Sequence, residues 1–288
     1  QVLGQQRQNF VSVKDETSGK VIIGVEDGAN NSYCDLLFYV NASKTIEEPN
    51  DRPVITPDDG NEPEKPDVTE TKTGTLAFED IWPGGGDYDM NDVIVEYNRA
   101  VSFDKKNQVT KIVDTFTPVH DGAVFANAFA YQVDKGQFGK MTFSATTEGI
   151  HTESATSSII VCPNVKQAIQ KVYTITREFT GGSFNKKDLK SYNPYIIVKY
   201  AEGQKGRTEV HLPKHEATSL ADLSLAGTQK DAYYIDKEGA YPFAIDIPIL
   251  NFISVTEKKS IDTEYPNFKA WADSKGEKYT DWYNNHVN

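Results

Sequence analysis

Residues 75–98 constrain the fold of this chain most, because they place a crowded acidic loop between two runs of strand-forming residues. Their sequence is TLAFEDIWPGGGDYDMNDVIVEYN, with β-branched and aromatic residues on both sides of three consecutive glycines. The stretch has no Lys or Arg, and its carboxylates are Glu79, Asp80, Asp87, Asp89, Asp92 and Glu96. Two carboxylates about 5 Å apart repel each other by roughly 3 kcal/mol at an effective dielectric constant near 20. The pattern therefore predicts a β-hairpin whose loop needs a compensating positive charge.

Oxygen-bearing side chains occupy alternate positions of this loop. Asp87, Asp89 and Asn91 follow the Asp-x-Asp-x-Asn spacing that also begins an EF-hand calcium loop. The glycine that an EF-hand needs next is Asp92 here, and a strand-like run follows, so the loop is not an EF-hand. Ca²⁺ takes about six to eight oxygen ligands, so Glu79 or Asp80 would have to complete the shell. We predict a Ca²⁺ site formed by Glu79, Asp80, Asp87, Asp89, Asn91 and Asp92; the alternative is a solvated acidic hairpin tip.

Two aromatic residues in the same loop are candidates for ligand contact. Trp82 could present an exposed face on which a sugar ring stacks, with Tyr88 nearby. A Trp before a Pro in a long loop more often anchors the loop on the core. The first interpretation makes the chain a carbohydrate-binding module, and the second gives Trp82 a structural role.

Residues 20–40, KVIIGVEDGANNSYCDLLFYV, repeat the pattern of strand, acidic pair, loop and strand. The oxygen ligands that this copy offers are Glu26, Asp27, Asn30 and Asp35. Ser32 and Cys34 stand where the later loop has Asp89 and Asn91. Because charged ligands are missing, we expect the first hairpin to bind a cation weakly or not at all.

The segment FEDIWPGGGDYDMNDVIVEY resembles the signature of the LruC-type domain of bacterial surface lipoproteins, notably of Bacteroidetes. Further segments resemble the same domain: FANAF at 125–129, HLP at 211–213, YPFAIDIP at 241–248, AW at 270–271 and DWY at 281–283. The resemblance extends over about residues 74–288 and implies an exported all-β protein with a cation site. The first hairpin is similar to another extracellular module with a GFED…DxNDxxF pattern, of which it is a degenerate copy.

Charge and composition exclude several classes of protein. A net charge of −12 and a pI of about 4.9 argue against nucleic acids and anionic membrane surfaces as partners. No run approaches the about 20 apolar residues of a transmembrane helix. The first residues, QVLGQQRQNFVSV, lack the apolar region of a signal peptide, so export is expected from the resemblance alone. We expect Cys34 and Cys162 to be free thiols, with Cys162 buried after an apolar run.

The chain is expected to have three parts. Residues 1–45 predict a small β-module, residues 46–73 a proline- and acid-rich linker, and residues 74–288 a β-sandwich or jelly-roll. The strands expected are 9–13, 20–25, 36–40, 92–103, 108–119, 123–133, 141–147, 157–161, 172–179, 195–200, 208–212 and 241–247. Two short C-terminal helices are expected at 267–273 and 280–284, anchored by Trp271 and Trp282.

No arrangement of catalytic residues can be recognised in the sequence. His211 and His215 have the i, i+4 spacing of a helical zinc site, but Pro213 and the strand-like residues before it rule out a helix, so we expect surface histidines. Glycosidase carboxylates face each other across a cleft, whereas these share one loop. We predict a non-catalytic cell-envelope protein that acts in adhesion, assembly or scaffolding, with a glycan or a cell-surface protein as partner. The carbohydrate-binding module is the alternative, and a glycan hydrolase has the weakest support.

Overall fold

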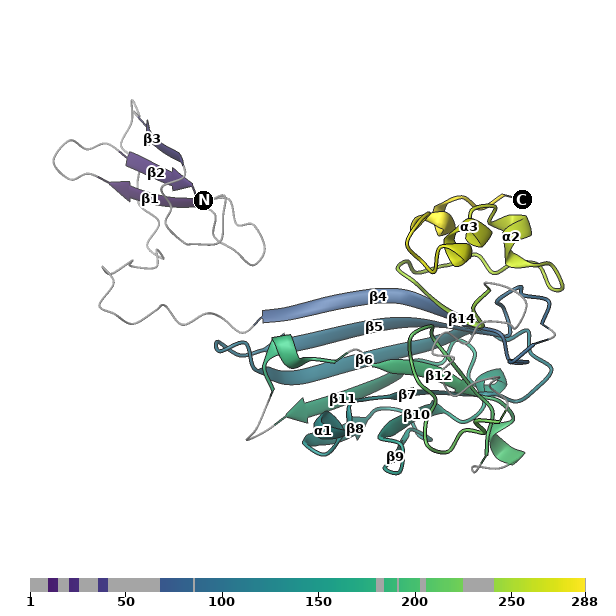
Figure 1. The fold of residues 1–288 in the computed structure, drawn as a ribbon. Helices are drawn as coiled ribbons and strands as arrows, with labels where there is room; N and C mark the ends of the chain where they lie inside the picture. Colours follow the sequence, from purple (N-terminus) through teal and green to yellow (C-terminus); the bar gives the residue numbers. More distant parts are fainter. Residues whose placement is uncertain are drawn as a thin grey trace. The chain divides into compact units, whose positions relative to one another are not determined.

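The computed structural model describes residues 10–14, 21–25, 36–40, 68–84, 86–179, 184–190, 192–202, 206–224 and 241–287 (Figure 1). The chain divides into two units, Gln1–Glu62 and Pro63–Asn288. The first contains an antiparallel sheet of β1 (Phe10–Lys14), β2 (Val21–Val25) and β3 (Leu36–Val40), which confirms the three predicted strands. Cys34 and the candidate ligands of the first hairpin lie outside the described residues.

The second unit contains two antiparallel sheets. The six-stranded sheet has the order β14–β4–β5–β6–β11–β8 and the five-stranded sheet the order β13–β12–β7–β10–β9. The strands of the larger sheet are β4 (Val68–Phe78), β5 (Val93–Phe103), β6 (Val109–His120), β8 (Met141–Ala145), β11 (Tyr173–Phe179) and β14 (Ala244–Ile247). The strands of the smaller sheet are β7 (Ala128–Gln132), β9 (His151–Glu153), β10 (Ser158–Cys162), β12 (Asn193–Ile197) and β13 (Glu209–His211).

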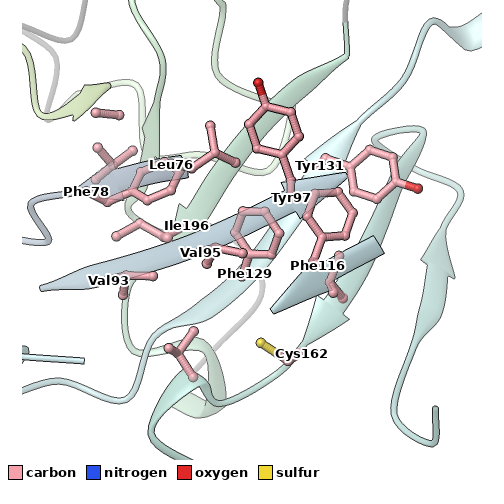
Figure 2. Close-up of a cluster of buried hydrophobic side chains, with 14 of the residues drawn as sticks. Leu76, Phe78, Val93, Val95, Tyr97, Phe116, Phe129, Tyr131, Cys162 and Ile196 are labelled. Atoms are coloured by element: carbon pink, nitrogen blue, oxygen red, sulfur yellow. The ribbon is translucent and has the colours of Figure 1, made fainter. Parts of the chain in front are cut away.

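The main core lies between these two sheets. Val95 and Phe116 of the larger sheet belong to the same buried cluster as Phe129, Tyr131 and Ile196 of the smaller sheet (Figure 2). The ring of Phe116 lies with its centroid 5.1 Å from that of Phe129 and 5.3 Å from that of Tyr131. Such aromatic pairs contribute about 0.5–1.5 kcal/mol each beyond the area that they bury. The prediction of an all-β sandwich is thereby confirmed.

The long hairpin of β5 and β6 is also confirmed, with Tyr97 opposite Phe116 in its register. β4 pairs with β5 from Val68 to Phe78, so it begins inside the range 46–73 that we expected to be linker. The reason is that residues 68–73, VTETKT, alternate β-branched and charged residues after the last proline of that range. Residues 46–67 lie outside the described residues, and a linker there stays a prediction.

The C-terminal segment covers the outer face of β4, β5 and β14. It contains α2 (Ile261–Glu264), α3 (Phe268–Asp273) and the 3₁₀ helix η4 (Trp282–Asn284), of which α3 and η4 were predicted (Figure 1). Trp282 is buried in a second cluster that includes Ala77 and Ile94 of the sheet. Both faces of β4 and β5 are therefore covered at this end, which explains why their sequences are continuously apolar there.

The short elements differ most from the prediction. α1 (Lys135–Phe138) and β9 were not predicted, because four and three residues give too little periodicity. The region 164–171, expected to be a short helix or an edge segment, contains the 3₁₀ helix η1 (Val165–Gln167). Two further 3₁₀ helices among the described residues are η2 (Lys186–Asp188) and η3 (Tyr200–Glu202). No helix in the described part of the chain is both long and apolar enough to span a membrane.

An ionic cluster is buried inside the sandwich. Arg177 donates from Nη2 to Asp114 Oδ2 at 2.8 Å, and Arg99 Nε lies 3.6 Å from Asp114 Oδ1. Tyr131 donates its hydroxyl proton to the same Asp114 Oδ2 at 3.1 Å. Asp114 and Arg177 have exposed fractions of 0%, and Arg99 of 8%. Two buried guanidinium groups thus share one carboxylate.

Candidate metal centre

Glu79 comes directly after β4, and its side chain is fully buried. Its backbone N–H donates to Phe243 O at 2.8 Å, and its Oε1 accepts from the N–H of Met90 at 2.5 Å. Its Oε2 is buried without a hydrogen-bond partner among the residues that the structure describes. A Cβ added to Gly86 would lie 2.9 Å from this oxygen, so the glycine lets the loop approach the carboxylate closely. The loop therefore surrounds a carboxylate oxygen that has a free lone pair.

Asp87 and Asp89 lie close to this carboxylate. One ligand atom from each of Glu79, Asp87 and Asp89 can be chosen so that all three lie within 4.8 Å of one another. Asp89 is 2% exposed, whereas Asp87 is exposed to solvent. The three carboxylates form an acidic cluster that could hold a metal ion, and Asp87 is its solvent-exposed member.

The backbone of the loop explains why these aspartates gather. Tyr88 and Met90 have φ angles of 58° and 55°, in the left-handed region that costs non-glycine residues about 1–3 kcal/mol. Both side chains are used for packing: the ring of Tyr88 lies 5.5 Å from Tyr241 and 5.6 Å from Phe243, and Met90 is 1% exposed. Packing of these two residues offsets the cost of the conformation that places Asp87 and Asp89 beside Glu79.

The C-terminal segment holds the loop in place. The N–H of Lys258 donates to Asp89 Oδ2 at 2.9 Å, and the N–H of Ile261 donates to Tyr88 O at 2.8 Å. Asn91 donates from Nδ2 to Val255 O at 3.2 Å. Residues about 170 positions apart in the sequence thus meet at the acidic cluster, and no local pattern predicts this.

The other predicted ligands have different neighbours. Asp80 donates its N–H to Asp92 Oδ2 at 2.8 Å, and its Oδ2 accepts from Asn127 Nδ2 at 2.7 Å. Asn91 Oδ1 is buried without a hydrogen-bond partner in the described part of the chain, and a Cβ on Gly122 would lie 2.4 Å from it. Asp80 is therefore hydrogen-bonded to Asp92 and to Asn127, and Asn91 donates its N–H to Asp89 Oδ1 at 3.2 Å, so the three predicted ligands lie beside the cluster. Their role as ligands stays a prediction.

The electrostatics of the loop favour bound protons or a cation. Burial and the charge of Asp92 raise the pKa of Glu79 to about 9. Burial and the charge of Asp80 raise the pKa of Asp92 to about 7. The pKa values of Asp80 and Asp89 are also raised, in both cases mainly by burial. A cation bound by these carboxylates would replace the protons that they otherwise retain near neutral pH.

A family model with the description "Domain of unknown function (DUF4842)" matches residues 107–283. The chain belongs to this family. The match includes most of the sandwich and the C-terminal helices but begins after the acidic loop. The comparison with curated proteins gives no match. The resemblance to the LruC-type domain and to a second extracellular module stays a prediction.

A crystal structure described as a "Putative lipoprotein from Bacteroides ovatus" is similar to this DUF4842 chain, with a TM-score of 0.55. The identity is 17%, and the alignment covers 93% of this chain and 89% of that chain. At this level of identity the likeness shows the fold alone.

Trp82 lies in the core of the DUF4842 chain. It is 6% exposed and belongs to the cluster between the two sheets, and the peptide bond to Pro83 is cis. The ring is therefore not an exposed platform for a sugar, and it anchors the loop as the second interpretation expected. Tyr88 is half-buried against two other aromatic rings.

The expectation of a surface histidine at His211 was wrong. His211 has an exposed fraction of 0%, its Nδ1 lies 2.8 Å from Asn193 Oδ1 and its Nε2 lies 2.9 Å from Glu209 Oε2. The reason is that the chain after β13 folds back over the strand, so that Thr218 donates from its N–H to the same Glu209 Oε2 at 2.8 Å. His215 is half-buried.

Glu209 is the centre of this buried network. Arg207 donates from Nε to Glu209 Oε1 at 2.7 Å, and the hydroxyl of Thr218 donates to the same oxygen at 2.7 Å. Burial alone would raise the pKa of Glu209, but hydrogen bonds from His211 and Thr218 and the charge of Arg207 lower it to about 2. Burial also lowers the pKa of His211, and the hydrogen bonds from Arg207 and Thr218 stabilise the Glu209 carboxylate whether or not the imidazole is protonated.

Cys162 is a buried free thiol, as predicted, and burial raises its pKa to about 12. A thiol with such a pKa is a poor nucleophile near neutral pH. The side chain of Cys162 therefore contributes to packing in the main core.

Proposed function

We propose that this chain is an exported, non-catalytic cell-envelope protein whose β-sandwich is stabilised by Ca²⁺ bound at Glu79, Asp87 and Asp89. Its role would be adhesion, assembly or scaffolding at the cell surface, with a glycan or a surface protein as partner. The main support for a bound cation is the environment of Glu79 Oε2. This oxygen is fully buried, has no hydrogen-bond partner among the described residues and lies in a cluster of three carboxylates.

The chemistry of the donor set favours Ca²⁺. All three ligands offer carboxylate oxygens, which suit hard cations, whereas zinc sites use mainly nitrogen and sulfur. Mg²⁺ demands near-ideal octahedral geometry, and Ca²⁺ accepts an irregular shell that water completes. The exposed Asp87 leaves room for water on one side.

A cation at this position would join three parts of the fold. Glu79 belongs to the end of β4, Asp87 and Asp89 precede β5, and Asp89 also accepts a hydrogen bond from Lys258 in the C-terminal segment. An ion would therefore connect the sandwich to the segment that carries α2 and α3. This supports a structural role for the ion.

Two further observations support the remainder of the proposal. The structural neighbour is described as a lipoprotein, which agrees with the envelope location that the LruC-type resemblance implies. The three carboxylates gather around one point, with one ligand atom of each within 4.8 Å of the others, whereas glycosidase carboxylates flank a scissile bond. A shared cation accounts for that crowding better than acid–base catalysis does.

Thermal unfolding in millimolar Ca²⁺ and in excess chelator tests the cation. At a free Ca²⁺ concentration of about 100 times the Kd, binding adds about 2.7 kcal/mol to the free energy of unfolding. For a unit of this size this raises Tm by roughly 5–10 °C. Asp87→Asn should lose most of the shift. The matched control is Glu148→Gln, which removes one charge from an exposed residue between β8 and β9 and should keep the shift.

Absence of a Ca²⁺-dependent shift in the wild-type chain would contradict the proposed site, and so would an equal shift in Asp87→Asn. The location is tested separately, by fractionating cells that express the complete gene and treating intact cells with protease. Recovery of the protein from the soluble cytoplasmic fraction alone would contradict the envelope proposal.

A further inference from the structure

The connection between β6 and β7, residues 121–127, packs against the acidic loop. Gly122 donates its N–H to Asn91 O at 3.1 Å, and Asn127 donates from Nδ2 to Asp80 Oδ2 at 2.7 Å. Asp80 in turn donates its N–H to Asp92 Oδ2. This connection therefore faces the residues of the loop that do not belong to the Glu79 cluster.

Two side chains of this connection bury oxygen atoms that have no hydrogen-bond partner in the described part of the chain. They are Asn127 Oδ1, in a residue with an exposed fraction of 0%, and both carboxylate oxygens of Asp121, whose side chain is 4% exposed. A buried polar atom without a partner costs about 1–3 kcal/mol, and more when it is charged. The ammonium of Lys166 and the N–H of Ala123 oppose the rise that burial causes in the pKa of Asp121. The charges of Lys166 and Lys199 do the same for the pKa of Asp80. The three oxygens nevertheless lack a hydrogen bond of normal geometry, so they are available to a ligand.

Lys166 supplies only part of the compensation. Its Nζ lies 3.6 Å from Asp121 Oδ1, beyond hydrogen-bond distance, and donates to Ala123 O. The Lys166 side chain is 40% exposed, so its ammonium can reach solvent if another cation takes its place beside the buried Asp121. A divalent cation could therefore displace it from Asp121.

We propose that Asp80, Asp121 and Asn127 form a second Ca²⁺ site, separate from the cluster of Glu79, Asp87 and Asp89. Asp121 and Asp80 would provide carboxylate oxygens, and Asn127 would provide Oδ1 while its Nδ2 continues to donate to Asp80. The ligands are all oxygens, as Ca²⁺ requires.

The two sites follow from the geometry at the end of β4. Glu79 and Asp80 are consecutive, and successive side chains of an extended chain point to opposite sides. Glu79 lies with Asp87 and Asp89, whereas Asp80 is hydrogen-bonded to Asn127. The end of β4 thus contributes one carboxylate to each site. Two bound ions would hold the acidic loop on two sides.

Equilibrium dialysis of the whole chain against Ca²⁺ tests this by stoichiometry. We expect two ions per wild-type chain, one in Asp121→Asn, one in Asp87→Asn and two in the control Glu148→Gln, each with an unchanged circular-dichroism spectrum. One ion in the wild type that Asp87→Asn removes would overturn the second site and keep the first. One ion that only Asp121→Asn removes would support the second site and overturn the first. No bound ion would overturn both.

A second variant keeps the test valid if Asp121→Asn does not fold. Lys166→Met removes an exposed ammonium that competes with the cation for Asp121. Ca²⁺ should then bind at the second site about fivefold tighter or more, because one like charge is lost at close range. Unchanged affinity, together with a lower Tm in chelator, would show that Lys166 is the true counter-ion of Asp121 and would overturn the proposal.

Discussion

Replacing Asp114 by Asn should destabilise the sandwich more than removing either of the arginines that it faces. Arg177 and Arg99 both direct guanidinium nitrogens at this carboxylate, at 2.8 Å and 3.6 Å, inside the space between the sheets. The native cluster therefore carries one buried positive charge in excess. Asp114→Asn would raise the excess to two, with no change in side-chain volume.

The expected size follows from this count. Removing one partner of a buried ion pair costs about 3–5 kcal/mol, because the other charge stays buried without compensation. Asp114→Asn leaves two such charges, so we expect a loss of at least about 4 kcal/mol. Arg177→Met leaves Asp114 with Arg99 and the hydroxyl of Tyr131, at 3.6 Å and 3.1 Å, so we expect about 2 kcal/mol or less.

Urea unfolding followed by tryptophan fluorescence measures the difference. All three tryptophans, Trp82, Trp271 and Trp282, belong to the unit that contains the sandwich, so the signal reports on that unit. The m-value should be equal in the wild type and both variants. A loss below about 1 kcal/mol in Asp114→Asn, or a larger loss in Arg177→Met, would refute the reasoning from buried charge.

Two further predictions concern stability alone. A Cβ at Gly74 would lie 2.7 Å from both Ile247 O and the Tyr97 ring, so Gly74→Ala should lower the free energy of unfolding by about 1–3 kcal/mol. At Gly84 a Cβ would meet no atom within 4 Å, so Gly84→Ala should change the free energy of unfolding by less than about 0.5 kcal/mol in the same urea titration. The pKa of Glu209 is lowered to about 2 from an ordinary value of 4.5, so its contribution, on the order of 3 kcal/mol, is complete above pH 4.5 and is lost as the pH falls toward 2. Glu209→Gln should be less stable at neutral pH and lose less stability than the wild type between pH 4.5 and 2.5; an unchanged slope of stability against pH would contradict this.

The regular strands could be predicted from the sequence because their alternation of apolar and polar residues reflects one buried face. β6 shows this over its 12 residues and β5 after its first three, and both were found where they were expected. β13 was also expected as a strand, but the burial of its second face was not, since the residues after it fold back and bury His211 on a face that looked solvated. Burial on the second face of a sheet depends on distant segments and leaves little local signal.

The candidate site shows the same division. The spacing of Asp87 and Asp89 identified the loop, because oxygen ligands at alternate positions form a local pattern. It could not decide between Glu79 and Asp80, which are neighbours in sequence but contact different segments. Asp121 and Asn127 were missed altogether, since no spacing connects them to the loop. Only the fold brings their segment to the acidic loop, where Asn127 donates to Asp80.

The most direct test of the central claim is an anomalous-difference electron-density map from crystals grown in millimolar Ca²⁺, repeated with a lanthanide ion in its place. The account predicts a peak among Glu79, Asp87 and Asp89, with carboxylate oxygens about 2.3–2.6 Å from the ion and Glu79 Oε2 among them. A map with no peak at this position, in which the three carboxylates are hydrogen-bonded to water or to one another, would contradict it.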